Sequence, residues 1–384
     1  MPRSPMVSQA AMGLRESVFS RLAGRLAAHP DPVPLHLGDT HLLPPSSALL
    51  LEPHTALRYG APAGAALLCE KLLAKLERQN GMRLESTQLQ ITCGATQALA
   101  VAARVLLDPG DEVITPTPHW PLIRGILGNV GAIPIEVELS QRLYADATLD
   151  PAALLLPHIG PRTSALYLAT PNNPDGKVLS KAQLGSIAAL AIAHDLWVIA
   201  DEVYEDLLFA GTHYSIAALP GMAERTVTAF SLSKSLALAG YRLGYLVGPA
   251  NVMRAARKVA NHTVYNVPEV LQLAAAHVLG TDEEDAWRKR AMGCYEEAAA
   301  SCALRLSGLA FVPDGATYFF LDLRAHVTDG SLWPLVETLL EEGVSVSPGE
   351  QFGSGFAGHT RICFAAVPLP RLELGLDRLR RLIG

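Results

Sequence analysis

The chain has 384 residues, a formal net charge of −6 and an apolar content of 49%, enough for a large core divided between two domains. The acidic balance argues against nucleic acid as a partner, and no apolar run is long enough to span a bilayer. Five cysteines without a CxxC pair favour free thiols over a disulfide framework, so we expect a globular protein of the cytoplasm.

The N-terminal part predicts a helix followed by a loop. Apolar residues recur at helical spacing at Leu14, Val18, Leu22 and Leu26. An amphipathic helix is a simpler interpretation of this Arg-rich segment than a targeting peptide. The Pro-rich stretch that follows contains Gly38 in LHLGDT, and Tyr59 lies in YGAPAG. Taken alone, these two stretches indicate only loop and turn chemistry.

A strand over 89–92 and a buried helix after it come next. The apolar positions of this helix are Leu99, Ala102, Ala103 and Leu106. The turn between the two elements contains Gly94, Ala95 and Thr96, at a helix N-terminus whose backbone amides can bind a phosphate. A glycine used only for close packing is an equally good interpretation at this point.

Asp108 to Trp120 predicts a turn, a strand and a Pro-containing loop. Trp120 is either a core residue or a large stacking surface. His119 is more simply a solvated loop histidine than a proton carrier, and it stays outside the predicted catalytic set.

The strand over 165–169 leads into TPNNPDG, which is a turn under any interpretation and contains Asn173. A cis bond between Asn173 and Pro174 would fit such a turn. Ser180 and Gln183 form a capping box for the next helix.

The following strand, over 196–200, ends at Asp201, with Tyr204 three residues later. The carboxyl end of a buried strand is where α/β sheets bind ligands. An unpaired carboxylate there is costly, so Asp201 favours a cationic ligand group.

A lysine and an arginine lie between two further apolar strands, over 226–230 and 243–247. Most lysines are solvated surface residues. Here Lys234 is surrounded by hydroxyl residues such as Ser231 and is followed by Arg242, whose guanidinium suits a phosphate. The segment therefore combines an amine nucleophile with an anion site.

The C-terminal part is predicted to be helical from 249 to about 279, with an interruption near Tyr265, and then to form a long charged helix. A strand is expected within 314–323. Arg361 opens an apolar strand in HTRICFA. Most such arginines are surface residues, but the guanidinium is also suited to bind a carboxylate with two bonds.

SLSK followed by AGYR resembles the cofactor-lysine segment of the class I and II aminotransferases, which are fold type I pyridoxal phosphate enzymes. TPNNPDG resembles the NPxNPTG turn of that family, with Thr170 in place of its first Asn and Asp175 in place of Thr. YGAPAG and DEVY occur in the family's order, and the resemblance covers nearly the whole chain. Asp175 is expected to add a charge near the entrance of the site.

The resemblance implies that pyridoxal 5′-phosphate is bound to Lys234 as an aldimine. The residues that it assigns to the phosphate are Gly94, Ala95, Thr96, Ser231, Arg242 and, from the other subunit of a homodimer, Tyr59. By the same resemblance Trp120 stacks on the cofactor ring and Asp201 pairs with its nitrogen.

The resemblance also assigns Asn173 and Tyr204 to the phenolic oxygen of the cofactor. Gly38, Asn173 and Arg361 contact the substrate, and Arg361 specifies an α-amino acid. Lys234, Asp201 and Tyr204 form the implied catalytic set, and no metal is expected.

The expected fold is an α/β, fold type I transferase with a mostly parallel sheet, helices on both of its faces and a smaller α/β domain. We predict an N-terminal segment at 1–44, a large cofactor-binding domain at 45–280 and a small domain at 281–384.

The expected reaction transfers the amino group of an α-amino acid to a 2-oxo acid. A lyase, cyclase or oxidase that uses the same cofactor is an alternative, because pocket groups decide the fate of the carbanion. A cofactor-binding regulatory domain is less favoured. In transcription factors such a domain normally follows a DNA-binding domain, and here the motifs begin within forty residues of the N-terminus. The donor stays open among alanine, aromatic, methionine and kynurenine-like amino acids.

Overall fold

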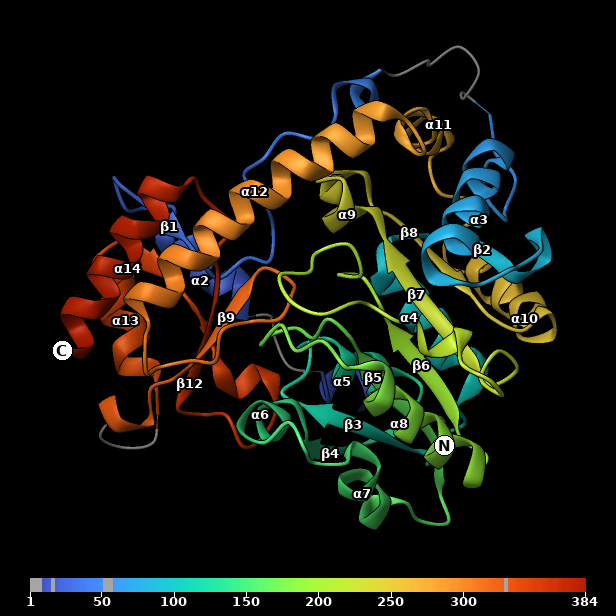
Figure 1. The fold of residues 1–384 in the computed structure, drawn as a ribbon, viewed down its shortest axis with the longest axis horizontal. Coiled ribbons are helices and arrows are strands. Elements are labelled where there is room, and N and C mark those ends of the chain that lie inside the picture. The colour runs from blue at the N-terminus through green and yellow to red at the C-terminus, as the bar shows by residue number, and fades with distance from the viewer. Residues whose placement is uncertain (1–8, 15–17, 51–57, 328–330) are drawn as a thin grey trace, which may run out of the picture.

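The computed structural model describes residues 9–14, 18–50, 58–327 and 331–384, and its centre is a seven-stranded sheet (Figure 1). The strands run in the order β2-β8-β7-β6-β5-β3-β4. Their bounds are β2 Leu89–Cys93, β3 Glu112–Thr117, β4 Ile133–Glu138, β5 Thr163–Ala169, β6 Trp197–Asp201, β7 Thr226–Ser231 and β8 Leu243–Val247. Only β8 pairs antiparallel to its neighbours, which confirms the prediction of a mostly parallel sheet.

Helices cover both faces of this sheet. One face packs against α4 Gly94–Leu106, α5 Ile123–Asn129 and α10 Ala250–Asn261. The other packs against α6 Ser140–Ala145, α7 Pro151–Leu155 and α8 Lys181–Ala193. On β5, Tyr167 faces the first layer and Leu166 and Leu168 face the second. Burial on both faces explains why the central parallel strands β5 and β6 contain continuous apolar runs rather than alternating ones.

A smaller α/β unit lies beside the sheet, and the first and last parts of the chain meet in it (Figure 1). Its antiparallel sheet contains β9 Tyr318–Asp322, β11 Ser347–Pro348 and β12 His359–Cys363. A second pair joins β1 Val33–Pro34 in parallel to β10 Val344–Ser345. Its helices include α2 Val18–Leu26, α13 Trp333–Glu341 and α14 Leu369–Ile383. The exact domain boundaries at 44 and 280 stay a prediction.

The remaining helices are α1 Gln9–Met12, α3 Ala66–Asn80, α9 Leu232–Ser235, α11 Glu269–Val278 and α12 Asp282–Arg305. In Figure 1, α12 runs from beside α11 to α14 and so links the large sheet to the smaller unit. Among the described residues, no helix combines the length and apolar character needed to span a bilayer.

Local sequence signals account for several element boundaries. The predicted capping box is confirmed, because the Ser180 hydroxyl accepts from the Gln183 amide while the Gln183 side chain accepts from the Ser180 amide. The helix predicted from the N-terminal apolar spacing begins at Val18 in the structure, and Leu22 and Leu26 are buried. Residues 15–17 lie outside the described part of the chain.

Candidate active site

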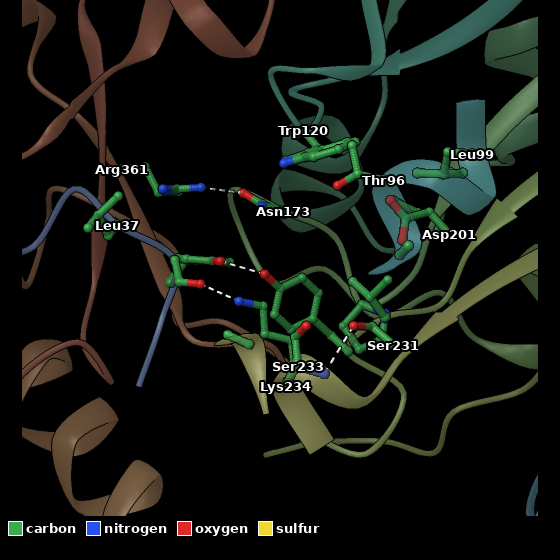
Figure 2. Close-up of a pocket in the computed structure, with 18 of the residues that line it drawn as sticks. Leu37, Thr96, Leu99, Trp120, Asn173, Asp201, Ser231, Ser233, Lys234 and Arg361 are labelled. Atoms are coloured by element: carbon green, nitrogen blue, oxygen red, sulfur yellow. Dashed lines mark hydrogen bonds between the residues drawn. The ribbon is translucent and has the colours of Figure 1, made fainter. Parts of the chain in front are cut away.

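A cavity of about 210 Å³ lies at the carboxyl ends of β5, β6 and β7 (Figure 2). Sequence-predicted residues that line it are Gly38, Ala95, Thr96, Trp120, Asn173, Asp201, Tyr204, Ser231, Lys234, Arg242 and Arg361. These residues are separated by up to 323 positions in the chain. Strand order and the docking of the smaller unit therefore bring them together, as the position of ligand sites in parallel sheets predicts.

One end of the cavity has the character of an anion site. Gly94 begins α4 with a φ of 72°, and a Cβ added to it would lie 2.6 Å from a guanidinium nitrogen of Arg242. Only a residue without a side chain allows this arginine to approach the helix N-terminus so closely. Ser231 caps α9 by accepting from the Ser233 amide at 3.0 Å. A helix N-terminus, an arginine and hydroxyl groups together fit a phosphate.

Lys234 presents a partly buried amine at the centre of the site. Its Nζ donates to the backbone carbonyl of Gly38. Burial lowers the pKa of Lys234, and the neighbouring cations Arg361 and Arg242 add to this effect while Asp39 opposes it. A larger share of the amine is therefore neutral and nucleophilic near neutral pH than in a solvated lysine.

Asp201 ends β6 and lies across the cavity from Arg361 in Figure 2. Its Oδ2 accepts a hydrogen bond from the Tyr167 hydroxyl at 2.8 Å, and its Oδ1 is buried without a hydrogen-bond partner. Burial raises the pKa of Asp201 to about 6. A buried carboxylate with an unsatisfied oxygen is costly, and a protonated pyridine nitrogen is a group that would satisfy it. The residues of this cavity therefore fit pyridoxal phosphate.

Arg361 lies on β12 at the opposite side of the site and is only 2% exposed. One of its terminal nitrogens donates to Asn173 Oδ1 at 2.9 Å. The other donates to the His36 carbonyl at 2.7 Å and to Ser347 Oγ at 3.3 Å. The guanidinium carbon also lies 4.4 Å from the centroid of the Tyr318 ring. These contacts hold the plane of the guanidinium in one orientation.

Tyr318, on β9, was missed by the sequence analysis although it lines the cavity. Its hydroxyl is hydrogen-bonded to that of Tyr204. A Cβ added to Gly38 would lie 2.1 Å from the Tyr318 oxygen, so glycine is required for this packing. The period-two pattern of this strand places Tyr318 and Phe320 on one face, but nothing in the sequence shows that this face meets Gly38.

Leu37 and Val203 also line the cavity and were not predicted. Both are chain neighbours of predicted site residues, which is the only local signal that points to them. Tyr167 gives a different signal, because it lies two residues before Ala169, which pairs with Asp201. It therefore shares a sheet face with that carboxylate.

Two expectations about polar residues near the site are wrong. His119 is buried rather than solvated, with Nδ1 3.0 Å from the Trp120 carbonyl and Nε2 3.4 Å from Glu136. Asp175 does not bring a charge to the entrance, because it is only 3% exposed. Its carboxylate accepts from the side chains of Ser140, Gln141 and Asn172. These hydrogen bonds hold the TPNNPDG turn in place from its buried side.

The expected cis bond between Asn173 and Pro174 is also wrong. The cis peptide bonds of this part of the structure are Thr117–Pro118 and Thr170–Pro171.

Tyr59 lies outside the cavity formed by one chain. It is 87% exposed, and its ring packs edge-on against Tyr265 with the ring centroids 5.3 Å apart. Its predicted role in the site of a second subunit therefore stays a prediction.

Residues 36–379 match the family described as aminotransferase class I and II. The arginine–pyruvate transaminase of Pseudomonas aeruginosa is 38% identical to this chain, over 84% of this chain and 79% of that protein. The aspartate/prephenate aminotransferase of Thermus thermophilus is 33% identical, over 85% of this chain and 83% of that protein. A solved structure of Thermus thermophilus aspartate aminotransferase with maleate superposes with a TM-score of 0.91 and 29% identity, covering 99% of this chain and 100% of that one.

Proposed function

The chain belongs to the class I and II aminotransferase family and is a pyridoxal phosphate-dependent enzyme that moves the amino group of an α-amino acid to a 2-oxo acid. We propose that Lys234, Asp201 and Arg361 carry out separate tasks in this reaction. The observation that carries the proposal is the partly buried amine of Lys234, which shares one cavity with a buried carboxylate and a buried guanidinium. Each of the three groups suits a different part of the reaction.

In this proposal the N-terminus of α4 would hold the cofactor phosphate. Gly94, Ala95 and Thr96 offer backbone amides there, and Ser231 and Arg242 add a hydroxyl and a positive charge. Trp120 forms a wall of the cavity and would offer the cofactor ring a stacking surface. When bound, pyridoxal phosphate supplies an aldehyde that condenses with amines and a ring that accepts electrons.

Lys234 Nζ would take the proton from the α-carbon of the amino acid and would deliver it to the cofactor carbon that carried the aldehyde. Its lowered pKa suits this task, because a base must be unprotonated at the working pH. Asp201 would hold a proton on the ring nitrogen, and Asn173 and Tyr204 would donate hydrogen bonds to the phenolic oxygen. Arg361 would bind the α-carboxylate and so orient the α-hydrogen toward Lys234.

The proposal includes a homodimer of the cytoplasm in which Tyr59 of one subunit completes the phosphate site of the other. The exposure of Tyr59 and Tyr265, at 87% and 53%, supports it, because exposed aromatic side chains are frequent in protein interfaces. We expect Tyr59→Phe to weaken pyridoxal phosphate binding by about 10-fold, which corresponds to one hydrogen bond to a charged group. Titration of the cofactor-free protein measures this change.

A hybrid dimer tests whether the sites are shared. A subunit with Lys234→Ala is combined with a differently tagged subunit with Tyr59→Phe, and the hybrid is isolated through both tags. If Tyr59 acts across the interface, one site of the hybrid has both native residues and binds the cofactor with wild-type affinity. If Tyr59 acts within its own chain, the only site with Lys234 has the weakened affinity. Light scattering that gives a single chain mass would contradict the dimer itself.

The substrates are tested by mixing the cofactor-loaded enzyme with single amino acids and no 2-oxo acid. The panel contains arginine and aspartate, which appear in the names of similar proteins, together with alanine, methionine, kynurenine and aromatic amino acids. We expect the physiological donor to give one equivalent of 2-oxo acid per subunit, and added pyruvate to allow a second turnover. Continued 2-oxo acid and ammonia release without an acceptor would favour a lyase, and oxygen consumption would favour an oxidase.

A further inference from the structure

We propose that Tyr167 is a positioning residue for Asp201, which it holds with one carboxylate oxygen fixed and the other directed to the cofactor. This inference rests on the proposed role of Asp201. Tyr167 is only 1% exposed, and its hydroxyl donates to Asp201 Oδ2 at 2.8 Å. The second oxygen, Oδ1, is the one without a hydrogen-bond partner.

The sheet register explains how Tyr167 reaches this carboxylate. Strands β5 and β6 are parallel, and Ala169 on β5 pairs with Asp201 on β6. Tyr167 precedes Ala169 by two residues, so its side chain leaves the sheet on the same face. A diagonal neighbour on the next strand lies about 7–8 Å away at the backbone, which the length of a tyrosine can span.

The bond from Tyr167 has an electrostatic effect as well as a geometric one. Burial raises the pKa of Asp201, whereas the hydrogen bonds from Tyr167 and from the Val203 backbone amide lower it, and the adjacent Glu202 raises it. The carboxylate of Glu202 is itself bonded to the Ser215 hydroxyl and His213. Tyr167 therefore favours the ionised form of Asp201 that a protonated ring nitrogen requires.

The hydrogen bond of Tyr167 has one alternative explanation, which is a purely structural role in the core. The ring lies in the core between the sheet and α4, among apolar side chains such as Ile199 and Leu99. A purely structural role would be to satisfy the tyrosine hydroxyl in that core. The two roles differ in what the removal of the hydroxyl does to the cofactor.

The test compares wild type with Tyr167→Phe, Asp201→Asn and the double variant, all prepared both free of cofactor and loaded with it. We expect Tyr167→Phe to weaken pyridoxal phosphate binding and to lower kcat by about 10-fold to 100-fold, the range for a hydrogen bond to a charged group. The KM of the amino donor should change less than about threefold, because Arg361 binds the donor on the other side of the cavity.

The double variant decides whether Tyr167 acts through Asp201. In the Asp201→Asn background, removal of the Tyr167 hydroxyl should change cofactor affinity by less than about twofold. Equal effects in both backgrounds would overturn the proposal, as would a Tyr167→Phe protein with wild-type cofactor affinity and kcat. If Asp201→Asn alone changes neither quantity, the proposed function of Asp201 is wrong, which is a distinct result.

Tyr144→Phe is the matched control. Its hydroxyl donates to the Asp175 carbonyl and accepts from the Asp314 amide, so this variant also removes a hydroxyl that makes hydrogen bonds within the protein. We expect wild-type cofactor affinity in it. A loss of affinity as large as that of Tyr167→Phe would show that any such hydroxyl has this effect, and the proposal would fail. Melting temperatures of all variants report their folding.

Discussion

Replacement of Lys234 by alanine should abolish amino transfer, with kcat lowered by about 10⁴-fold or more, the upper end of what a positioned general base contributes. The physical reason is that, among the residues that the structure describes, Lys234 is the one lysine that lines the site cavity. No second lysine of that lining is therefore available to replace it as nucleophile or base. Single-turnover kinetics with the donor identified by the panel measures the change.

The Lys234→Ala protein should still bind pyridoxal phosphate, because Arg242, Ser231 and the N-terminus of α4 are unchanged. Borohydride treatment followed by peptide mass spectrometry should locate the cofactor on the peptide that contains Lys234 in wild type and on no peptide in the variant. Lys181→Ala is the control, since Lys181 is exposed and lies over the Tyr214 ring. A variant at Lys234 that keeps its turnover would show that the site is assigned to the wrong lysine.

Replacement of Arg361 by lysine should lower kcat/KM for the amino acid by about 10²-fold to 10³-fold. A lysine keeps the charge, but its ammonium lacks the planar set of donors of a guanidinium. It therefore cannot bond Asn173, the His36 carbonyl and a substrate carboxylate at the same time. The loss should lie mainly in KM, because the same carboxylate contact is made in the ground state and in the transition state.

A substrate comparison separates loss of carboxylate binding from general damage. Wild type should prefer an amino acid over the corresponding amine without the α-carboxylate, and Arg361→Lys should lose most of that preference. The matched control is Arg162→Lys, because the Arg162 side chain is 67% exposed and is paired with Glu112. If Arg361→Lys retains the wild-type preference for the amino acid, another group binds the carboxylate.

Local sequence patterns predicted the elements that position the site. The reason is that the formation of a strand or of a helix start depends mainly on residues that are close together in the chain. The strand over 243–247 has the predicted bounds, and the strand before Asp201 is shifted by a single residue. Apolar runs identify strands that are buried on both faces, and a capping box identifies a helix start, without reference to distant residues. The family resemblance added the order of the site residues along the chain.

The sequence by itself therefore determined the α/β class, the mostly parallel sheet and the chemical groups available at its carboxyl edge. The tertiary structure alone decided the partners of those groups. Arg361 meets Asn173 across 188 residues, and Tyr204 meets Tyr318 across 114. Burial of His119 and Asp175 depended on contacts from elements that their own segments do not specify. The physical reason is that periodicity encodes which face of an element is buried, whereas side-chain pairing depends on strand order, register and the docking of the smaller unit.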